Sequence, residues 1–324
     1  MKIACICSTK NEADVIESFV RLNGRICDSF FFADDSTDNT RAILNLLVQE
    51  GYDLSFLPSV HGGHNQPTST KAHLAAVKRK ANPDWIFLLD ADEIIVARDK
   101  DALIEEISAV PPDGYLAAEW RTFVPVSLAY FESTSPLSEC FALRKDRHEA
   151  FRKISVPGRI VDHITTTPGN HSARSLSRTP LVERPAASYY LAHFPVRSAQ
   201  QIIVKNLIAM HNLVARSDAE HGEGFHVFPV ADLIRRRDYA LTIDDLADLA
   251  TNYARPDHVP SPAIADDLDR QDNPWLQTEL RYRRLATINV IGRLDGEIDR
   301  LSKEIRERRR GLKFDAVYFQ SHRS

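Results

Sequence analysis

The first hundred residues alternate between short apolar runs and segments in which apolar positions recur at helical spacing. The apolar runs predict strands, and they lie at 2–7, 28–33, 53–57 and 85–89. The helical spacing predicts amphipathic helices, and these lie at 11–22, 39–50 and 71–80. Strands that alternate with helices build an open, mostly parallel sheet with helices on both faces. The pattern therefore predicts an α/β fold for this part of the chain.

After residue 100 the alternation is less regular. A helix is predicted at 101–109, and strands follow at 114–126 and 140–145. Residues 155–180 are rich in Ser, Thr, Pro and Gly, which predicts loops. Further helices are predicted at 198–215, 230–252 and 276–310. We therefore expect two parts, an α/β domain over 1–215 and a mainly helical region over 216–324, with a linker at about 255–275.

Composition and charge narrow the class of protein. The net charge is -4 and the pI is near 6.3, which gives no electrostatic reason to expect nucleic acid as a partner. The amino terminus has too short an apolar run for a signal peptide, and no stretch is apolar enough to span a membrane. The four cysteines match no zinc spacing and are expected to be buried free thiols: Cys5, Cys7, Cys27 and Cys140. These features together predict a cytoplasmic protein.

Polar clusters follow three of the predicted strands. They are STKNE at 8–12, DDSTDNT at 34–40 and DADE at 90–93. In open α/β sheets ligands bind beyond the carboxyl ends of the strands. The three clusters are therefore expected to converge on one active site.

Two of these clusters suggest specific chemistry. Asp90 and Asp92 are two apart in an extended segment, so their carboxylates face the same way. Hard oxygen ligands of this kind suit Mn²⁺ or Mg²⁺, although acidic residues after a strand also cap helices. In DDSTDNT, Asp34 or Asp35 could accept hydrogen bonds from a base or ribose, while Ser36, Thr37 or Asp38 could cap the next helix.

Five sequence blocks occur in a characteristic order over about residues 1–210. They are KNEADVIESFVRLN, FADDSTDNTRAIL, WIFLLDADEII, GNH at 169–171 and AHFPVRSAQQ at 192–201. Together they resemble the family 2 glycosyltransferases, most closely the bacterial branch associated with surface-polysaccharide synthesis. The remaining residues resemble no family.

The resemblance implies a GT-A fold, a nucleotide-diphosphate sugar donor, with a UDP-sugar favoured, and a divalent metal. It also implies roles for individual residues, namely Thr9 and Glu12 near the base, Asp34 near uracil or ribose, Lys71 on the donor, Asp90 on the ribose side and Asp92 on the metal. In the common family turn a glycine stands where this chain has Asp35. The nucleoside contact is therefore left between Asp34 and Asp35.

Two histidines match late positions at which this branch carries a ligand to the metal or diphosphate. They are His171 and His193, and the resemblance does not choose between them. Arg197, four residues after His193, could bind a diphosphate with both arms of its guanidinium, or could be a charge on a helix surface.

An inverting transfer needs a carboxylate base to deprotonate the acceptor hydroxyl. Glu119 is one candidate, because it lies beside Trp120, which could stack on a sugar. A buried structural role for Glu119 is equally consistent with the sequence, and Asp162 and Glu132 are alternatives.

The sequence thus predicts a metal-dependent glycosyltransferase that moves a sugar to a glycan or lipid-linked acceptor. The alternatives are a nucleotidyltransferase, although no glycine-rich phosphate loop follows the first strand, and a non-catalytic sugar-nucleotide-binding protein. The last helix carries an apolar stripe, consisting of Leu294, Ile298, Leu301 and Ile305. Packing on the catalytic domain or against a second copy in a homodimer fits its mixed charges better than insertion into lipid. The basic end at 308–310 could provide weak peripheral contact with the inner face of a membrane.

Overall fold

The computed structural model describes residues 1–58, 66–144, 152–177, 179–215, 227–253, 268–269, 273–287, 290–294, 296 and 298. The chain divides into two compact units. Unit 1 consists of residues 1–198, 242–253 and 259–287, and unit 2 of residues 199–241, 254–258 and 288–324. Most of the predicted linker and the predicted helix beyond residue 298 lie outside the described residues. None of the described helices is long and apolar enough to cross a membrane.

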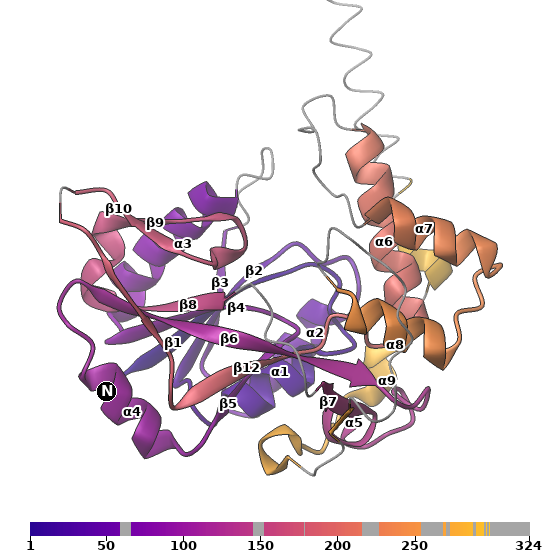
Figure 1. Cartoon of the computed structure of the whole chain (residues 1–324), viewed down its shortest axis with the longest axis horizontal. Coiled ribbons are helices and arrows are strands. Elements are labelled where there is room, and N and C mark those ends of the chain that lie inside the picture. The colour runs from indigo at the N-terminus through magenta and orange to yellow at the C-terminus, as the bar shows by residue number, and fades with distance from the viewer. Residues whose placement is uncertain are drawn as a thin grey trace, which may run out of the picture. The chain divides into compact units, whose positions relative to one another are not determined.

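Unit 1 is built on a large sheet whose first four strands are parallel. In spatial order they are β3 (Leu54–Leu57), β2 (Ser29–Asp34), β1 (Ile3–Thr9) and β4 (Trp85–Asp90). The helices α1 (Ile16–Asn23), α2 (Thr40–Gln49) and α3 (Gln66–Ala81) connect them, as Figure 1 shows. This half confirms the predicted α/β fold.

Beyond β4 the sheet becomes mixed. β8 (Arg152–Pro157) pairs antiparallel with β4 and with the long strand β6 (Gly114–Pro125). β7 (Phe141–Arg144) and β13 (Leu268–Asp269) extend the sheet past β6. β11 (Val182–Pro185) and β12 (Tyr189–His193) run parallel to β6, and β5 (Glu93–Ala97) pairs antiparallel with β12.

Shorter elements complete the two units. Unit 1 also holds α4 (Lys100–Ser108), α5 (Pro136–Glu139), η1 (Gly158–His163), β9 (Ile164–Thr166), η2 (Pro168–Asn170), β10 (Ala173–Ser175), α8 (Ile243–Thr251), η4 (Pro274–Leu276) and α9 (Arg283–Ala286). In unit 2, α6 (Ala199–Ala215) packs against α7 (Val227–Arg236).

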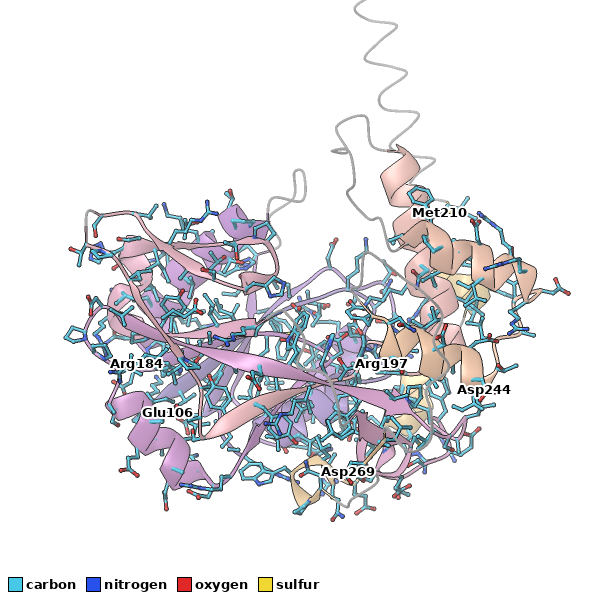
Figure 2. The ribbon with its side chains drawn as sticks, in the orientation of Figure 1. Glu106, Arg184, Arg197, Met210, Asp244 and Asp269 are labelled. Carbon is cyan, nitrogen blue, oxygen red and sulfur yellow. The ribbon has the colours of Figure 1, made fainter. Side chains whose placement is uncertain are left out.

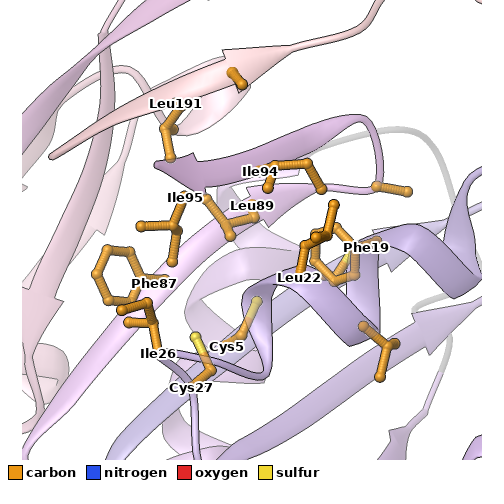
Figure 3. Close-up of a cluster of buried hydrophobic side chains, with 14 of the residues drawn as sticks. Cys5, Phe19, Leu22, Ile26, Cys27, Phe87, Leu89, Ile94, Ile95 and Leu191 are labelled. Carbon is orange, nitrogen blue, oxygen red and sulfur yellow. The ribbon is translucent and has the colours of Figure 1, made fainter. Parts of the chain in front are cut away.

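Helices cover both faces of the sheet, as predicted, and each face has its own core. On one face Phe19 of α1 packs edge-on against Phe30 and Phe32 of β2, and the cluster extends to Cys5 and Leu191 (Figure 3). Under α3 the other core includes Leu74 and Val77. Alternate residues of β1, β2 and β4 serve the two cores, because side chains alternate across a strand.

The cysteines are buried free thiols, as predicted. Cys5 and Cys7 lie in the same core because they are two residues apart on β1. Burial raises the pKa of both thiols well above the usual value, so they stay protonated and inert.

Some element predictions were wrong, each for a local reason. The helix predicted at 11–22 begins only at Ile16. The residues before it form a loop, in which Asn11 accepts hydrogen bonds from Thr37 and Asp38 in the turn after β2. The region 155–180 was predicted as loop but contains β8, η1, β9, η2 and β10. In β8 the inward-facing residues include Lys153 and Ser155, so the strand lacks the usual apolar run.

Two predicted C-terminal helices were also wrong in extent. The predicted helix at 230–252 is two helices, with a break between Arg236 and Ile243 that ends in a capping box at Thr242. The helix predicted to start at 276 does not, since 277–282 is not helical. That segment is itself part of unit 1 and packs on α1 through the backbone amides of Arg281 and Tyr282.

Candidate active site

The carboxyl ends of β2, β1 and β4 meet at one edge of the sheet. Thr9 at the end of β1 lies level with Asp34 of β2, and its neighbour Ser8 lies level with Asp90 of β4. The three polar clusters are therefore adjacent. This follows from parallel pairing, which carries the three strand ends to the same edge.

The loops after β1 and β2 are tied together by side chains. The Asn11 backbone lies in the left-handed region at φ 62°, which Asn tolerates better than most residues. Its side-chain oxygen accepts hydrogen bonds from the Thr37 and Asp38 amides at 2.8 and 3.2 Å. Thr9 donates to the Asp34 carboxylate at 3.0 Å. The Asp34 carboxylate is thereby held at the sheet edge with one oxygen already bonded.

Lys153 of β8 joins the site from the middle of the sheet. Its ammonium is buried and lies 2.5 Å from the Asp90 carboxylate and 3.0 Å from that of Glu93. The other Glu93 oxygen accepts the Asp90 amide at 2.8 Å. Asp90 itself is 42% exposed, so it presents its carboxylate outward while Lys153 and Glu93 hold it from behind.

Burial and charge set the protonation of this group. Burial alone would lower the pKa of Lys153, but the carboxylates of Asp90 and Glu93 raise it above the usual value, so the ammonium stays charged. Burial raises the pKa of Glu93 to about 8, and the charges of Asp90 and Asp92 add to this while Lys153 opposes it. One lysine serves two carboxyls, and the buried Glu93 is the one that retains its proton near neutral pH.

Asp92 faces two residues from the 192–201 block. Its Oδ1 lies 4.0 Å from the Nε2 of His193, and its Oδ2 lies 3.6 Å from a terminal nitrogen of Arg197. The backbone fixes this arrangement, because the Phe194 amide donates to the Asp92 carbonyl at 2.9 Å. The pair Asp92 and His193 is therefore preassembled.

Arg197 is neither on a helix surface nor exposed to a ligand (Figure 2). It is 1% exposed, and its Nε donates to Asp14 at 2.7 Å while a terminal nitrogen donates to Glu12 at 2.6 Å. Tyr130 supports the same group by donating to the Asp14 carbonyl at 2.9 Å. The guanidinium thus joins the loop after β1 to Asp92.

Trp120 lies between the two late histidines. The His193 ring stacks on it at 4.4 Å between centroids, and the His171 ring meets it edge-on at 5.2 Å. The ammonium of Lys153 lies 5.6 Å from the same ring. Trp120 is 7% exposed, so it supports His193 and does not offer a face for stacking on a sugar.

The two histidines differ in what their nitrogens contact. His171 Nδ1 is bonded to the Arg152 carbonyl at 2.8 Å, and burial lowers the pKa of this histidine. His193 is the one whose ring nitrogen faces Asp92.

The structure does not bring the remaining predicted residues to this group. Glu119 precedes Trp120 on β6, so its side chain points to the opposite face of the strand, where it lines a cavity of about 260 Å³ with Arg121 and Tyr190. Asp162 lies in η1, which directly follows β8. The end of β8 pairs with the start of β4. The Lys78 ammonium donates to the Asp162 carboxylate at 2.6 Å. Asp162 is therefore at the opposite edge of the sheet.

Three further residues were named from the sequence. Asp35 is exposed at the edge directly after Asp34, and its amide donates to the Thr9 carbonyl at 3.0 Å. Lys71 is exposed on α3. The exposed Glu132 is in the loop after β6, where its carbonyl accepts from Arg283.

Sequence analysis missed Lys153, Glu93 and Asp14. Glu93 and Asp14 stand inside recognised blocks but have no assigned role in them. A charged residue between apolar ones, as in KISV at 153–156, was the available sign that β8 carries a buried cation.

The charges at this edge suit a divalent cation. In the ion pairs described above, the carboxyl groups of Asp90, Asp92, Asp14 and Glu12 outnumber the cations of Lys153 and Arg197. The described residues contain no group of three or more His, Cys, Asp or Glu side chains that would form a metal site by themselves. Mg²⁺ and Mn²⁺ bind through one or two carboxylates together with substrate phosphates. Asp92 and His193 therefore fit as the protein's share of such a site.

The fold and the edge define an α/β protein with an acidic site at the carboxyl ends of its parallel strands. Known proteins bear a limited likeness to it. No protein-family profile matches the sequence, and no curated protein sequence matches it.

Similar solved structures include TarS from S. aureus, with 13% identity, 74% of this chain and 73% of that chain covered, and a TM-score of 0.34. A mannosyltransferase from Pyrobaculum calidifontis, in complex with GDP-Man and Mn²⁺, has 14% identity, 78% and 79% coverage and a TM-score of 0.34. Glucosyl-3-phosphoglycerate synthase from Mycobacterium tuberculosis, in complex with Mn²⁺ and UDP, has 14% identity, 68% and 81% coverage and a TM-score of 0.34. At this level the likeness assigns no role to any residue, and function is argued from the site.

Proposed function

We propose that the chain is a metal-dependent glycosyltransferase that uses a nucleotide-diphosphate sugar, with a UDP-sugar favoured. The observation that carries this proposal is Asp92 at the end of β4 with His193 4.0 Å away, inside a group with excess negative charge. Asp92 and His193 would hold Mn²⁺ or Mg²⁺, which would neutralise the charge that develops on the departing diphosphate. The acceptor in this proposal is a hydroxyl of a glycan or of a lipid-linked saccharide, attacked with inversion.

The residues of the neighbouring strand ends take the nucleoside in this proposal. Thr9 and Asp34 are already bonded to each other, and Asp35 and Glu12 flank them. Asp90 presents its carboxylate toward the ribose side, because Lys153 holds it from behind. Lys71, exposed on α3, would meet the donor's phosphates.

Arg197 enters this proposal as a positioning residue, not as a diphosphate ligand. Its guanidinium is buried and engaged by Asp14 and Glu12. A role in binding diphosphate would require it to leave those partners.

The test is a thermal-shift screen of nucleotide sugars with and without Mn²⁺, followed by calorimetry with the best ligand. A ligand that binds only the folded state raises the melting temperature. At a ligand concentration a hundredfold above Kd, it adds about 2.7 kcal/mol to the free energy of unfolding. Asp92→Asn is expected to abolish the Mn²⁺-dependent part of nucleoside diphosphate binding. Asp101→Asn makes the same chemical change at an exposed carboxylate on α4 and is the matched control.

Three results would count against the proposal. Unchanged Mn²⁺-dependent binding in Asp92→Asn would remove the metal assignment. Release of pyrophosphate instead of a nucleoside diphosphate would make the chain a nucleotidyltransferase. Binding without any turnover on a range of saccharide acceptors would favour a sugar-nucleotide-binding protein.

A further inference from the structure

The two oxygens of Asp92 have different surroundings. Oδ1 faces the Nε2 of His193 at 4.0 Å, whereas Oδ2 forms an ion pair with Arg197 at 3.6 Å. The two oxygens of one carboxylate are thus directed to different partners. Oδ1 is the oxygen that faces the residue that would share a metal with it.

Arg197 has little freedom to release Oδ2. Asp14 engages two of its nitrogens at 2.7 and 3.2 Å, and Glu12 engages one at 2.6 Å. The nitrogen nearest Asp92 also donates to the Phe194 carbonyl at 3.2 Å. Phe194 in turn donates its amide to the Asp92 carbonyl. The guanidinium and the Asp92 backbone are therefore fixed to the same residue.

The way a carboxylate binds discriminates between divalent cations. Ca²⁺ takes six to eight oxygens and accepts bidentate carboxylates, whereas Mg²⁺ requires near-octahedral geometry and few protein ligands. A carboxylate with one oxygen held by a cation offers only the other to a metal. Such a carboxylate suits a small octahedral ion and is a poor ligand for Ca²⁺.

We propose that Arg197 is a specificity-determining residue that restricts Asp92 to binding through Oδ1 and so favours Mn²⁺ and Mg²⁺ over Ca²⁺; this rests on the proposed function only in taking Asp92 as the metal ligand. Arg197 acts through Asp92 and is a positioning residue. The contacts that restrict Asp92 are all between residues of this chain, so they act before a donor is bound.

The readout is a ratio of affinities measured without turnover. Calorimetry on the full chain gives the Kd of Mn²⁺, Mg²⁺ and Ca²⁺ as chloride salts, and the ratio of the Ca²⁺ to the Mn²⁺ value is compared between variants. Both ions are divalent, so a change in local charge affects both Kd values and largely cancels in the ratio. A change in the orientation of Asp92 affects the two Kd values differently and therefore changes their ratio.

Arg197→Lys keeps the charge but loses the fork that reaches Asp14, Glu12 and Asp92 together. We expect the ratio to fall by about tenfold, the usual effect of losing a partner that orients a metal ligand. Tyr130→Phe is the matched control, because it removes one hydrogen bond to Asp14 without contacting Asp92. It is expected to lower stability and leave the ratio unchanged.

A folded Arg197→Lys protein with an unchanged ratio would overturn the proposal. Should that variant not fold, Glu12→Gln releases one contact of the guanidinium from a partly exposed position and is expected to lower the ratio by about threefold. An unchanged ratio there, or a wild type that binds Ca²⁺ as tightly as Mn²⁺, would also overturn it. If Asp92→Asn leaves Mn²⁺ affinity unchanged, the proposed function fails instead.

Discussion

At the scale of single residues, the buried charge of Lys153 both stabilises the fold and positions carboxyl groups of the candidate site. It is fully buried, and two carboxyls and one aromatic ring surround its ammonium. Removing water from a charge is costly unless partners replace it. Here the partners are the partly exposed Asp90 and the buried Glu93. The lysine therefore links the middle of the sheet to the site.

Replacement of Lys153 by Met is expected to lower the free energy of unfolding by about 3–5 kcal/mol, because it leaves the buried Glu93 carboxyl and the Asp90 carboxylate without their shared cation. Urea unfolding followed by circular dichroism measures this. Lys78→Met is the control, since Lys78 pairs with Asp162 in a largely exposed position and should cost ~0–1 kcal/mol. Adding Glu93→Gln to Lys153→Met should restore part of the loss. Equal effects of the two lysine substitutions would contradict this account.

The two histidines give a second prediction at this scale. His193→Ala is expected to weaken binding of Mn²⁺ with UDP by about tenfold or more, and His171→Ala much less, because only His193 faces Asp92. Both substitutions remove one ring from Trp120, so each controls for the packing effect of the other. Calorimetry decides between them. The reverse order would assign the ligand role to His171, and equal small effects would leave both as supports of Trp120.

At the scale of elements, the parallel half of the sheet could be predicted and the mixed half could not. β1, β2 and β4 are continuous apolar runs because both their faces are covered by helices. β8 contributes Lys153 and Ser155 to the interior, and its partners β4 and β6 are distant in sequence. Lys153 and Ser155 interrupt the apolar residues of β8, so the sequence of this strand predicted a loop.

The candidate site divides in the same way. Asp90, Asp92 and His193 could be found because they stand in short blocks. The role of Arg197 could not, because its partners Asp14 and Glu12 lie more than 180 residues away. The direction of the Glu119 side chain could not be predicted either, because one position on a strand decides which way a side chain points.

A second element joins distant parts of unit 1. Residues 273–287, which we call the strap, cross α1 and α2. Glu17 accepts the Arg281 and Tyr282 amides at 2.7 and 2.9 Å, and Arg25 donates to the Pro274 carbonyl at 3.1 Å. The Glu50 carboxylate accepts hydrogen bonds from Arg21 at 2.8 Å and from the Tyr282 hydroxyl. Carboxylates at the ends of two helices thus hold the strap in place.

This arrangement gives a pH dependence. The hydrogen bond from Arg21 lowers the pKa of Glu50 from 4.5 to about 2, and Tyr282 and Arg281 act in the same direction. Because the folded-state pKa is depressed, the stabilisation is present above about pH 4.5 and is lost as the pH falls toward 2. Glu50→Gln should be less stable than wild type by about 1–2 kcal/mol at pH 7, a value reduced for solvent screening.

Thermal unfolding across pH 2–7 checks this. The difference in stability between wild type and Glu50→Gln is expected to shrink below about pH 4.5. Glu105→Gln, at a carboxyl on α4 outside these contacts, serves as control. A difference that stays constant down to pH 2 would contradict the role assigned to the Glu50 cluster.

At the scale of the whole molecule, unit 1 uses three separate stretches of the chain, and each residue proposed for donor binding precedes residue 198. Two truncations separate the strap from the residues after it. A chain that ends after Thr287 keeps the strap, whereas one that ends after Trp275 loses the contacts to Glu17 and Glu50.

We expect the shorter chain to be less stable by about 3 kcal/mol or more, because charged carboxylates lose their hydrogen-bond donors. Both chains should bind UDP with Mn²⁺, which donor titration measures. Light scattering on the longer truncation tests whether the predicted homodimer depends on residues after 287. Lost donor binding in a folded chain ending after Thr287 would show that residues after 287 take part in the site.

The strap also has a consequence for how the protein is made. Glu17 and its partner Arg281 are 264 residues apart in the chain. Ribosomes add roughly 5–20 residues per second, so the strap leaves the ribosome about 13–50 s after the helix it covers. Until residues 273–287 have been translated, Glu17 and Glu50 lack their hydrogen-bond partners in the strap, so this step in the assembly of unit 1 cannot take place earlier.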